Sequence, residues 1–432
     1  MFDNLNIQIA GGLDFPLPNM ALVRQSFVRQ PLVDPTAAVL AQLHRPEIAA
    51  TIQLGAEIAI GVGSRGIANL EEITRATVQG IKQLGGRPFI FPAMGSHGGA
   101  TAAGQQDVLA GYGITEERVG APIRATMEAV LVTTMGDGTR LYMDKYAHAA
   151  DGVVLINRIK PHTDFKGAIE SGIVKMMIIG MGKIQGATIM HTEHGMINFA
   201  EALPPAAAVL MNHIPFLFGL GLVEDGYENT AVIEAILAPQ LLERERKLQA
   251  QAKKMMARLY FPEIDVLIIE QIGKDISGAG MDPNVIGRGS RAAYGFNQPA
   301  ITKIVALDLT AKTKGNACGL GLADVITAHL FKQIDFEYTY ANVITSAYLD
   351  AGAIPLVMKT EADAIRLAVK TTPKVKPAKA RIVHIRDTLT LDTIAVSQVL
   401  LEQVETHERL TQIGALEAVV FEANGRLRRL PH

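Results

Sequence analysis

Cysteine is almost absent from this sequence, which has one, Cys318, among 432 residues. A single thiol excludes an internal disulfide framework, a cysteine zinc site and a cysteine-ligated iron–sulfur cluster. A transition metal would therefore have to be held by histidines, by carboxylates, or by ligands that the protein does not itself supply.

Aromatic residues, net charge and long apolar runs are also scarce. Tryptophan is absent, aromatic residues make up 5% of the chain, and the formal net charge is −2, which gives no electrostatic case for nucleic acid or an acidic membrane surface. The apolar runs are broken well short of a membrane span, and no basic segment followed by an apolar core opens the chain as in a signal peptide. We therefore expect a cytoplasmic protein without nucleic-acid or membrane partners.

Glycine, in contrast, is abundant. The 40 glycines are scattered among apolar runs, a pattern typical of tight turns between strands and helices. At this length one core is too few, and we predict an N-terminal catalytic and cofactor domain at residues 1–258 and a smaller α/β domain at residues 259–375. Residues 376–432 are expected to return to the N-terminal domain. A charged amphipathic helix at residues 239–259 and a proline- and lysine-rich segment at residues 371–380 are expected to be linkers.

The first half of the chain alternates strand-like and helix-like segments. The expected strands are residues 56–63, 87–95 and 151–159. Asn69 followed by Glu72 predicts a capping box at the start of the helix after the first strand. Such alternation predicts an α/β fold, with a largely parallel sheet covered by helices on both faces. We expect two lobes with the active site in the cleft, because ligands of such sheets bind at the loops after the strand C-termini.

The C-terminal domain is expected to continue this pattern. Strands are predicted at residues 265–273 and 302–310, followed by a glycine-interrupted helix at residues 315–331. A further strand at 353–359 would precede a helix after Thr360.

Two histidines follow predicted strands directly. His97 lies in the glycine-rich segment GSHGGAT, which is neither a Walker A sequence nor GxGxxG and fits a tight turn as well as an anion site. A turn requires the glycines but has no need of an imidazole. His162 lies in PHTDFKG, directly after the strand at residues 151–159.

The segment from residue 161 to residue 195 holds the densest group of reactive side chains. Its members are His162, Lys166, Lys175, Lys183, His191 and His194. His191 and His194 could present two imidazoles on one helix face as metal ligands. The alternative is that these residues are polar groups at the rim of the core.

The order and spacing of these motifs resemble those of the nickel-dependent lactate racemases. The matching pieces are GSHGG, NRIKPH, SGIVK and the first histidine of IMHTEHG. His191 follows Lys175 by 16 positions, as in the family, and His162 follows His97 by 65 positions, within one residue of the family separation. Ser171 and Gly172, just before Lys175, fix the register of the match, which covers residues 50 to 200.

The resemblance implies a role for each matched residue. Lys175 would carry a nickel-pincer nucleotide, a pyridinium thioacid mononucleotide with nickel, joined to the lysine through a thioamide, with Ser171 and Gly172 beside it. His191 would be the one protein ligand of the nickel, because the pincer supplies two sulfurs and a carbon. His97 and His162 would be the two acid/base groups on either side of the substrate.

The sequence also departs from the family at three places, the first being about three extra residues between Pro161-His162 and the SGxxK piece. The family's Asp-x-Thr-Arg motif is replaced here by Val62-Gly63-Ser64-Arg65, which keeps the arginine and loses the aspartate. Arg65 could hold a substrate carboxylate or a cofactor phosphate, or form a surface salt bridge. The family's glutamine and lysine from the second lobe are not evident, and Arg288 or Arg291 could take their place.

The implied activity is that of an isomerase, a racemase or epimerase of a 2-hydroxy acid such as lactate or a larger acid. Beside an ionised carboxylate the α-hydrogen is a poor acid, so its removal as hydride requires an electrophilic cofactor that side chains cannot replace. The partners would be the small-molecule substrate and the cofactor-synthesis enzymes, and a homodimer is compatible with the sequence. Two alternatives stay open: a zinc- or iron-dependent hydrolase or lyase that uses the histidines, and a non-catalytic protein that binds an organic acid or cofactor.

Overall fold

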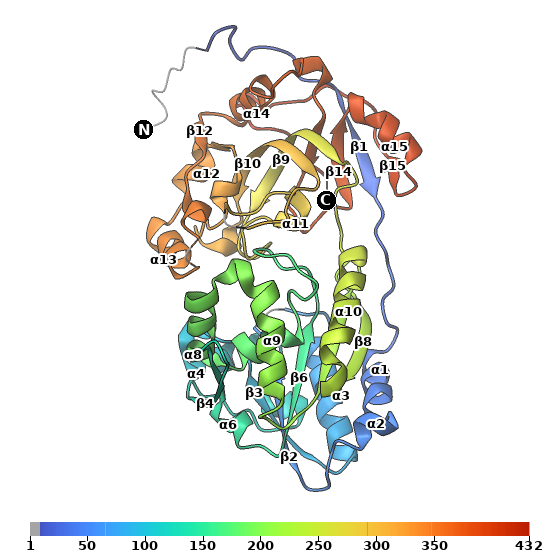
Figure 1. Ribbon diagram of the computed structural model, residues 1–432. Helices are drawn as coiled ribbons and strands as arrows, with labels where there is room; N and C mark the ends of the chain where they lie inside the picture. Colours follow the sequence, from blue (N-terminus) through green and yellow to red (C-terminus); the bar gives the residue numbers. More distant parts are fainter. Residues whose placement is uncertain (1–8, 65, 292, 347, 432) are drawn as a thin grey trace. The chain divides into compact units, whose positions relative to one another are not determined.

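The computed structural model describes residues 9–64, 66–291, 293–346 and 348–431. The chain divides into two compact units, whose helices and strands are labelled in Figure 1. Val28–Met256 form what we call the N-terminal unit, and Met1–Phe27 together with Ala257–His432 form the C-terminal unit. Both contain a mixed or mainly parallel sheet with helices, which confirms the predicted α/β class.

The N-terminal unit is built on a five-stranded sheet in the order β3-β2-β6-β7-β8. The first four strands run parallel, and β8 pairs with β7 in the antiparallel direction. The strands are β2 (Glu57–Val62), β3 (Arg87–Pro92), β6 (Gly152–Arg158), β7 (Phe216–Glu224) and β8 (Thr230–Leu237), and β4 (Ala129–Thr134) and β5 (Arg140–Asp144) form a separate hairpin. The three strands predicted in this half of the chain are therefore confirmed.

Both faces of this sheet are buried, as expected of a parallel sheet. Successive residues of β2 and β6 contribute alternately to two cores, one on each face, since side chains alternate across a strand. One core includes residues of α1 (Pro35–Leu43), α2 (Pro46–Ala49), α3 (Leu70–Gln83) and α4 (Ala102–Gly111). The other includes residues of α6 (Lys145–His148), α7 (Ile173–Lys175), α9 (Phe199–Met211) and α10 (Leu241–Met255). The remaining helices are α5 (Glu116–Val119) and α8 (Lys183–Ile189).

Two local expectations in this unit are corrected. Asn69 has φ +58° and no capping hydrogen bond from its side chain, which instead donates to Glu72 Oε2 at 3.3 Å, so the capping box does not form. Helix α10 is not a bridge, because its apolar face, with Leu241 and Leu248, lies in the core of the N-terminal unit.

The C-terminal unit has an eight-stranded sheet in the order β12-β11-β10-β9-β13-β14-β1-β15. Its strands are β1 (Met20–Gln25), β9 (Glu263–Ile272), β10 (Ala300–Leu309), β11 (Val325–Thr327), β12 (Leu356–Met358), β13 (Ile382–Ile385), β14 (Thr393–Ser397) and β15 (Leu410–Gln412). The strands from β12 to β13 run parallel, and β14, β1 and β15 are antiparallel. The helices are α11 (Pro283–Ile286), α12 (Ala328–Lys332), α13 (Phe336–Ser346), α14 (Glu361–Lys370) and α15 (Leu401–Thr406).

This sheet corrects the predicted domain boundaries. Residues 376–432 do not return to the N-terminal unit, because β13 pairs with β9 and β14 pairs with β13. Residues 1–258 are not one domain either, because β1 lies between β14 and β15. The segment at residues 371–380 connects α14 to β13 within one unit. The glycine-interrupted helix expected at residues 315–331 is instead a loop followed by β11 and the short α12.

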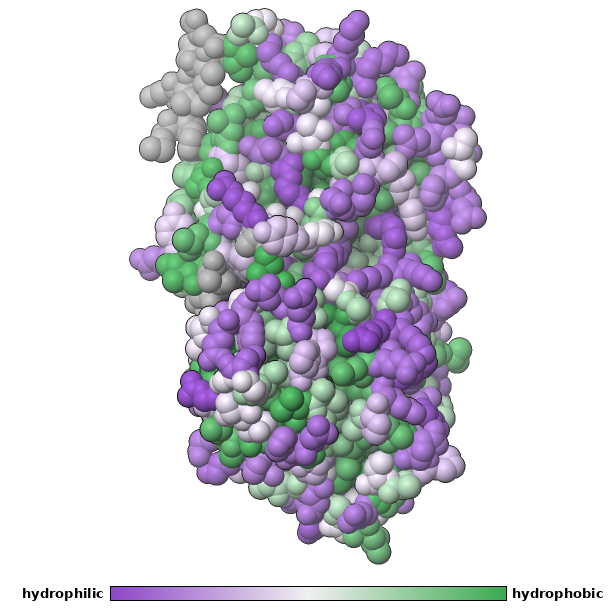
Figure 2. Space-filling model, in the orientation of Figure 1, coloured by the Kyte–Doolittle hydropathy of each residue, from purple (hydrophilic) through white to green (hydrophobic). Residues whose placement is uncertain are grey.

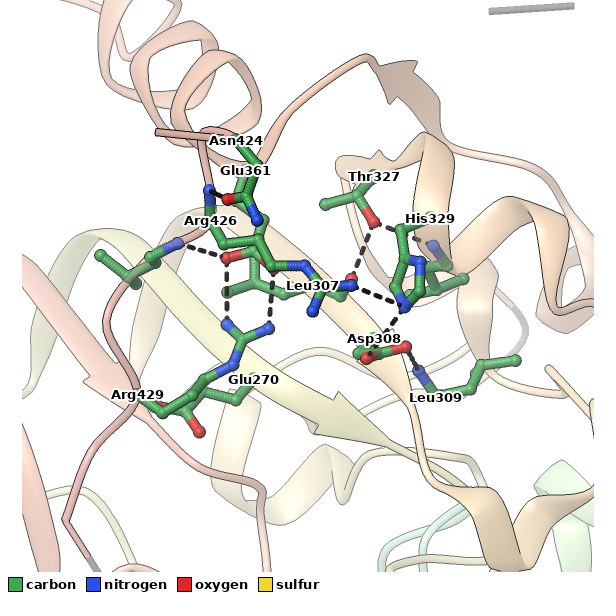
Figure 3. A network of polar contacts seen from close by, with 12 residues as sticks. Glu270, Leu307, Asp308, Leu309, Thr327, His329, Glu361, Asn424, Arg426 and Arg429 are labelled. Carbon is green, nitrogen blue, oxygen red and sulfur yellow. Dashed lines mark hydrogen bonds and ion pairs between the residues drawn. The ribbon is translucent and has the colours of Figure 1, made fainter. Parts of the chain in front are cut away.

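The last residues of the chain are tied to the C-terminal unit by buried carboxylates (Figure 3). Glu361, at the start of α14, receives two hydrogen bonds from the Arg429 guanidinium, at 2.7 and 3.1 Å, and one from Leu427 N at 2.6 Å. Glu270 on β9 accepts from Leu430 N at 2.7 Å. Bidentate arginine–carboxylate pairing of this kind fixes orientation as well as distance.

Along the described chain, no single helix has the length and apolar composition needed to cross a membrane. Ile173–Gly180 and Lys183–His194, a pair bent by 105°, would meet that requirement only together and on length and composition alone. The face drawn in Figure 2 carries hydrophilic and hydrophobic side chains intermixed.

Candidate active site

The candidate site lies at one edge of the N-terminal sheet. Val62 at the end of β2 is in register with Pro92 of β3 and with Ile156 of β6, so the parallel strands end together. The loops that follow carry His97 and His162, as the sequence predicted. Ligands of parallel sheets bind at this carboxyl edge.

His162 is held by a buried carboxylate. Glu170 accepts from His162 N at 2.7 Å and from Gly167 N at 3.0 Å. Lys253 on α10 lies 2.5 Å from Glu170 Oε1 and neutralises it. The imidazole is buried and stacks on the Phe165 ring, with the centroids 4.3 Å apart. The ring therefore has a fixed orientation, which a catalytic base requires.

The Lys175 amine lies in hydrogen-bond contact with His162 Nε2. It also lies 5.9 Å from the centre of the Phe165 ring, and the side chain is half-buried. On the other side of the imidazole, Asp164 N donates to Nδ1 at 3.0 Å. Because Asp164 N occupies Nδ1, Nε2 is the ring nitrogen that faces the Lys175 amine. An amine in its unprotonated form is a nucleophile, and this one lies beside an imidazole that can exchange a proton with it.

His191 is linked to the same cluster through two aromatic rings. Its imidazole is tilted against Phe199 at 5.0 Å, and Phe199 packs edge-on against Phe165 at 5.8 Å. Burial lowers the pKa of His191, and the positive charge of Lys175 lowers it further. The imidazole is therefore neutral at neutral pH, the form that binds metals.

Lys175 and His191 come together because the chain between them bends. In one straight helix their 16-residue separation would span about 24 Å. Instead, π-helical turns at Met176–Gly180 (η3) and Met190–His194 (η4) flank α8, and the two helical halves meet at 105°. Such irregular turns are frequent at functional sites.

Ser171 and Gly172 fix the start of α7, on which Lys175 lies. Lys160 and Ser171 exchange backbone hydrogen bonds of 3.0 and 3.2 Å, and Asn157 Nδ2 donates to Gly172 O at 2.6 Å. A Cβ at Gly172 would collide with the carboxylate of Glu245. Glycine is thus required by packing, and the contacts seen for both residues are structural ones.

Glu245 is a site residue that the sequence analysis missed. It projects from α10, is completely buried, and accepts from Val174 N at 3.1 Å. Burial raises the pKa of Glu245 to about 8, against the opposing effect of amide hydrogen bonds from Val174 and Ile173. Its spacing from Leu241 and Leu248 places it on the apolar face of α10. This position was the signal in the sequence that could have identified Glu245 as a buried carboxylate.

His97 is exposed on the loop between β3 and α4. Its Nδ1 shares a hydrogen bond with Ser64 Oγ, which follows β2. Next to Ser64, a Cβ at Gly63 would lie 3.1 Å from Met176 Cε, so this loop packs close to the residue after Lys175. Arg65 lies outside the described residues, so its contact with a carboxylate or phosphate stays a prediction.

Two other residues considered for the site, His194 and Arg288, are engaged in contacts elsewhere. His194 Nε2 hydrogen-bonds with Thr139 Oγ1 at 2.9 Å, so this ring nitrogen is engaged with the β4–β5 hairpin. Arg288 is engaged within the C-terminal unit, where it contacts Asp324 at 2.7 Å and donates to three backbone carbonyls. Arg291 is exposed in that same unit, and its role stays a prediction.

Comparison with known proteins gives only distant likenesses. No protein-family model matches the chain, and no curated protein sequence matches it significantly. Among solved structures, the chain is similar to the lactate racemase apoprotein from Thermoanaerobacterium thermosaccharolyticum, with 13% identity, coverage of 85% of this chain and 94% of that chain, and a TM-score of 0.49. It is also similar to a Thermotoga maritima protein, with 12% identity, coverage of 65% and 72%, and a TM-score of 0.44. These likenesses concern the course of the backbone and place no ligand in this chain.

The described side chains do not by themselves form a complete metal site. Within the described ranges no three histidine, cysteine, aspartate or glutamate residues converge as ligands. The cluster instead offers one half-buried amine, Lys175, a neutral imidazole within its electrostatic reach, and an oriented imidazole in contact with it. This donor set suits a group that attaches covalently and brings most of its own ligands.

Proposed function

We propose that this chain is a racemase or epimerase of 2-hydroxy acids that uses a nickel-pincer nucleotide attached to Lys175. One observation carries the proposal: the Lys175 amine lies against His162 and within electrostatic reach of His191. His162 precedes Lys175 by 13 positions and His191 follows it by 16, so the fold is what brings the three side chains together.

The residues of the site fit such a group. Lys175 would hold it covalently, and the neutral imidazole of His191 would complete the metal's coordination. When bound, the group would supply a reversible acceptor for the hydride of the α-carbon. The single histidine ligand accounts for the lack of a three-residue ligand set within the described ranges.

The two strand-end histidines would handle the hydroxyl proton. His162 is buried and oriented by Glu170 and Phe165, so it would accept or return the proton on one side of the substrate. His97 would do the same on the other side, with its ring oriented by Ser64. Racemisation is symmetric and requires one such base for each hand of the substrate. Arg65 would bind the substrate carboxylate.

The substrate would be a small 2-hydroxy acid and the loading partners would be the enzymes that make the cofactor, in the cytoplasm. The zinc or iron hydrolase has no specific observation in its favour, since no three-ligand group is found in the described part of the chain. A non-catalytic binding protein would use the same cluster without turnover, so turnover is what separates it from the proposed enzyme.

The attachment can be tested by intact-protein mass spectrometry after expression with cofactor-synthesis enzymes. The wild-type chain should gain the mass of the pincer group and stoichiometric nickel, and peptide mapping should place the added mass on Lys175. Lys175→Arg should lose both, because a guanidinium is not acylated, while the exposed Lys247→Ala on α10 should keep both.

Turnover of lactate, malate and sugar acids by the loaded protein then tests the reaction. His97→Ala should lower inversion by roughly 100-fold or more while nickel stays bound, as expected for loss of an acid/base group. Protein that contains stoichiometric nickel but an unmodified Lys175 would contradict the proposal. Full activity of His97→Ala would contradict it as well.

A further inference from the structure

Lys183 is a buried lysine for which the proposed reaction has no use. It lies at the bend between the two helical halves, is completely buried, and has φ +56°, a conformation rare for residues other than glycine. Its Nζ donates to Pro92 O at 2.5 Å and to Gln105 Oε1 at 3.1 Å. Asp144 Oδ2 lies 3.0 Å from the same nitrogen. These contacts join the ends of β3 and β5 to helix α4.

The partner of Lys183 on α4 holds the loop that carries His97. Gln105 is completely buried, and its Nε2 donates to Gly95 O at 2.9 Å and to His97 O at 3.2 Å. Because Oε1 is taken by Lys183, the amide cannot turn over without losing all three bonds. Gly95 N also donates to Gly180 O at 2.9 Å in the bent helix, so the loop is fixed on two sides.

Stability alone gives a weak reason for this arrangement. Burial raises the pKa of Asp144 and lowers the pKa of Lys183, the signature of two charges withdrawn from water. Replacing a buried ion pair by apolar side chains of similar volume is often neutral or stabilising, so such pairs are better explained by the geometry they impose. Here the geometry imposed is that of the His97 loop.

We propose that Gln105 and Lys183, anchored by Asp144, are positioning residues that hold His97 at the strand edge. The consequence for catalysis rests on the proposed function, because it is there that His97 acts as a base. The consequence for the loop does not, and it can be measured on the purified chain without metal or substrate.

The test compares two isosteric substitutions of buried glutamines. Gln105→Met removes both hydrogen bonds to the loop and the acceptor for Lys183. Gln249→Met on α10 is the matched control, because Gln249 is equally buried and its amide has no partner within the described residues. In Gln105→Met, the Gly95 and His97 amides should exchange with solvent roughly tenfold faster, and the His97 ring resonances should shift. In the control both should stay as in the wild type.

A second pair of variants separates positioning from folding. Lys183→Met leaves Asp144 buried and unpaired, so it is expected to lower thermal stability. Lys183→Met combined with Asp144→Asn removes the unpaired charge and keeps the Oδ1 acceptor that caps α6 at Tyr146 N and Ala147 N, so it should recover stability while the His97 loop stays loosened. Recovery of stability together with wild-type exchange at Gly95 and His97 would overturn the proposal, as would unchanged exchange in folded Gln105→Met.

Loaded enzyme adds a result that distinguishes the two proposals. Gln105→Met should lower kcat while the mass addition on Lys175 and the bound nickel are unchanged, since its contacts do not reach that residue. If neither the wild type nor any variant carries the added mass on Lys175, the proposed function is wrong. The exchange data on the metal-free chain would still decide whether Gln105 and Lys183 position His97.

Discussion

At the scale of single residues, the site is organised around the environment of one amine. Lys175 has an imidazole in contact, an aromatic face beside it, and a second imidazole near enough to feel its charge. Aromatic packing of Phe165 and Phe199 sets the separation of the two imidazoles. The Lys175 amine therefore has neighbours that a surface lysine lacks, and such neighbours change how readily an amine binds a proton.

The charge coupling between Lys175 and His191 gives a direct test of this arrangement. In Lys175→Met the pKa of His191 should rise relative to the wild type, because one of the two causes that lower it is removed. It should stay below its ordinary value, because burial, the larger cause, remains. Titration of the His191 ring by nuclear magnetic resonance measures both effects.

Lys247→Met serves as the control for that titration. Lys247 is exposed on α10 and pairs with Glu243, so its removal should leave His191 unchanged. Equal titration of His191 in the wild type and in Lys175→Met would mean that the two side chains do not approach each other.

At the scale of elements, α10 determines how α7 begins. Glu245 projects from α10 into the space that a side chain at residue 172 would occupy, and accepts hydrogen bonds from the first amides of α7. Free amides at a helix start require acceptors, and a buried carboxyl supplies one here. The glycine of the SGIVK motif is therefore explained by a residue more than seventy positions away.

The raised pKa of Glu245 predicts how stability depends on pH. In the folded chain this carboxyl is protonated up to about pH 8, whereas in the unfolded chain it ionises near pH 4.5. Between these values the folded state binds the extra proton, so the stability from this group is complete below pH 4.5 and falls as the pH rises to about 8. The loss is at most about 1.4 kcal/mol per pH unit.

Glu245→Gln removes this dependence and keeps an acceptor for Val174 N. The free energy of unfolding is measured by urea denaturation at pH values from 5 to about 8. As the pH rises, the value for Glu245→Gln should increase relative to the value for the wild type. Gln249→Met on the same helix is the control, because it changes a buried side chain and leaves the titration of Glu245 unchanged. Gln249→Glu is not a suitable control, because it adds a buried charge. Parallel pH profiles of wild type and Glu245→Gln would refute a protonated Glu245.

At the scale of the whole molecule, the two units differ in how the chain builds them. The N-terminal unit is one continuous segment with its own sheet and two cores. The C-terminal unit needs both ends of the chain, because β1 lies between β14 and β15. Every described residue of the candidate site belongs to the continuous unit.

We therefore expect residues 28–256 to fold alone. The excised segment should unfold cooperatively and retain the ring-current shifts of His162 against Phe165. A chain that starts at residue 28 should keep this unit intact but lose at least about 2 kcal/mol of stability in the C-terminal unit, the order of one buried valine such as Val23. Separate chemical denaturation of the two shortened chains, with the full chain as reference, measures both; an excised segment without cooperative unfolding would contradict the expectation.

The sequence by itself determined the alternation of strands and helices, the placement of His97 and His162 after parallel strands, and the group of Lys175 and His191. These features depend on local periodicity and on short spacings, which a linear pattern records. Two local predictions from the sequence were wrong. The capping box at Asn69 gave way to a left-handed residue, and the glycine-rich stretch before β11 was not helical because its glycines pack backbone against backbone.

Only the tertiary structure decided which residues surround Lys175 and which unit each end of the chain joins. Glu245 reaches the start of α7 from α10, Gln105 and Asp144 meet at Lys183 from separate elements, and β1 joins strands at the other end of the chain. The physical reason is that burial and pairing between distant segments set these contacts, and a buried charged residue resembles a surface one until its neighbours are known.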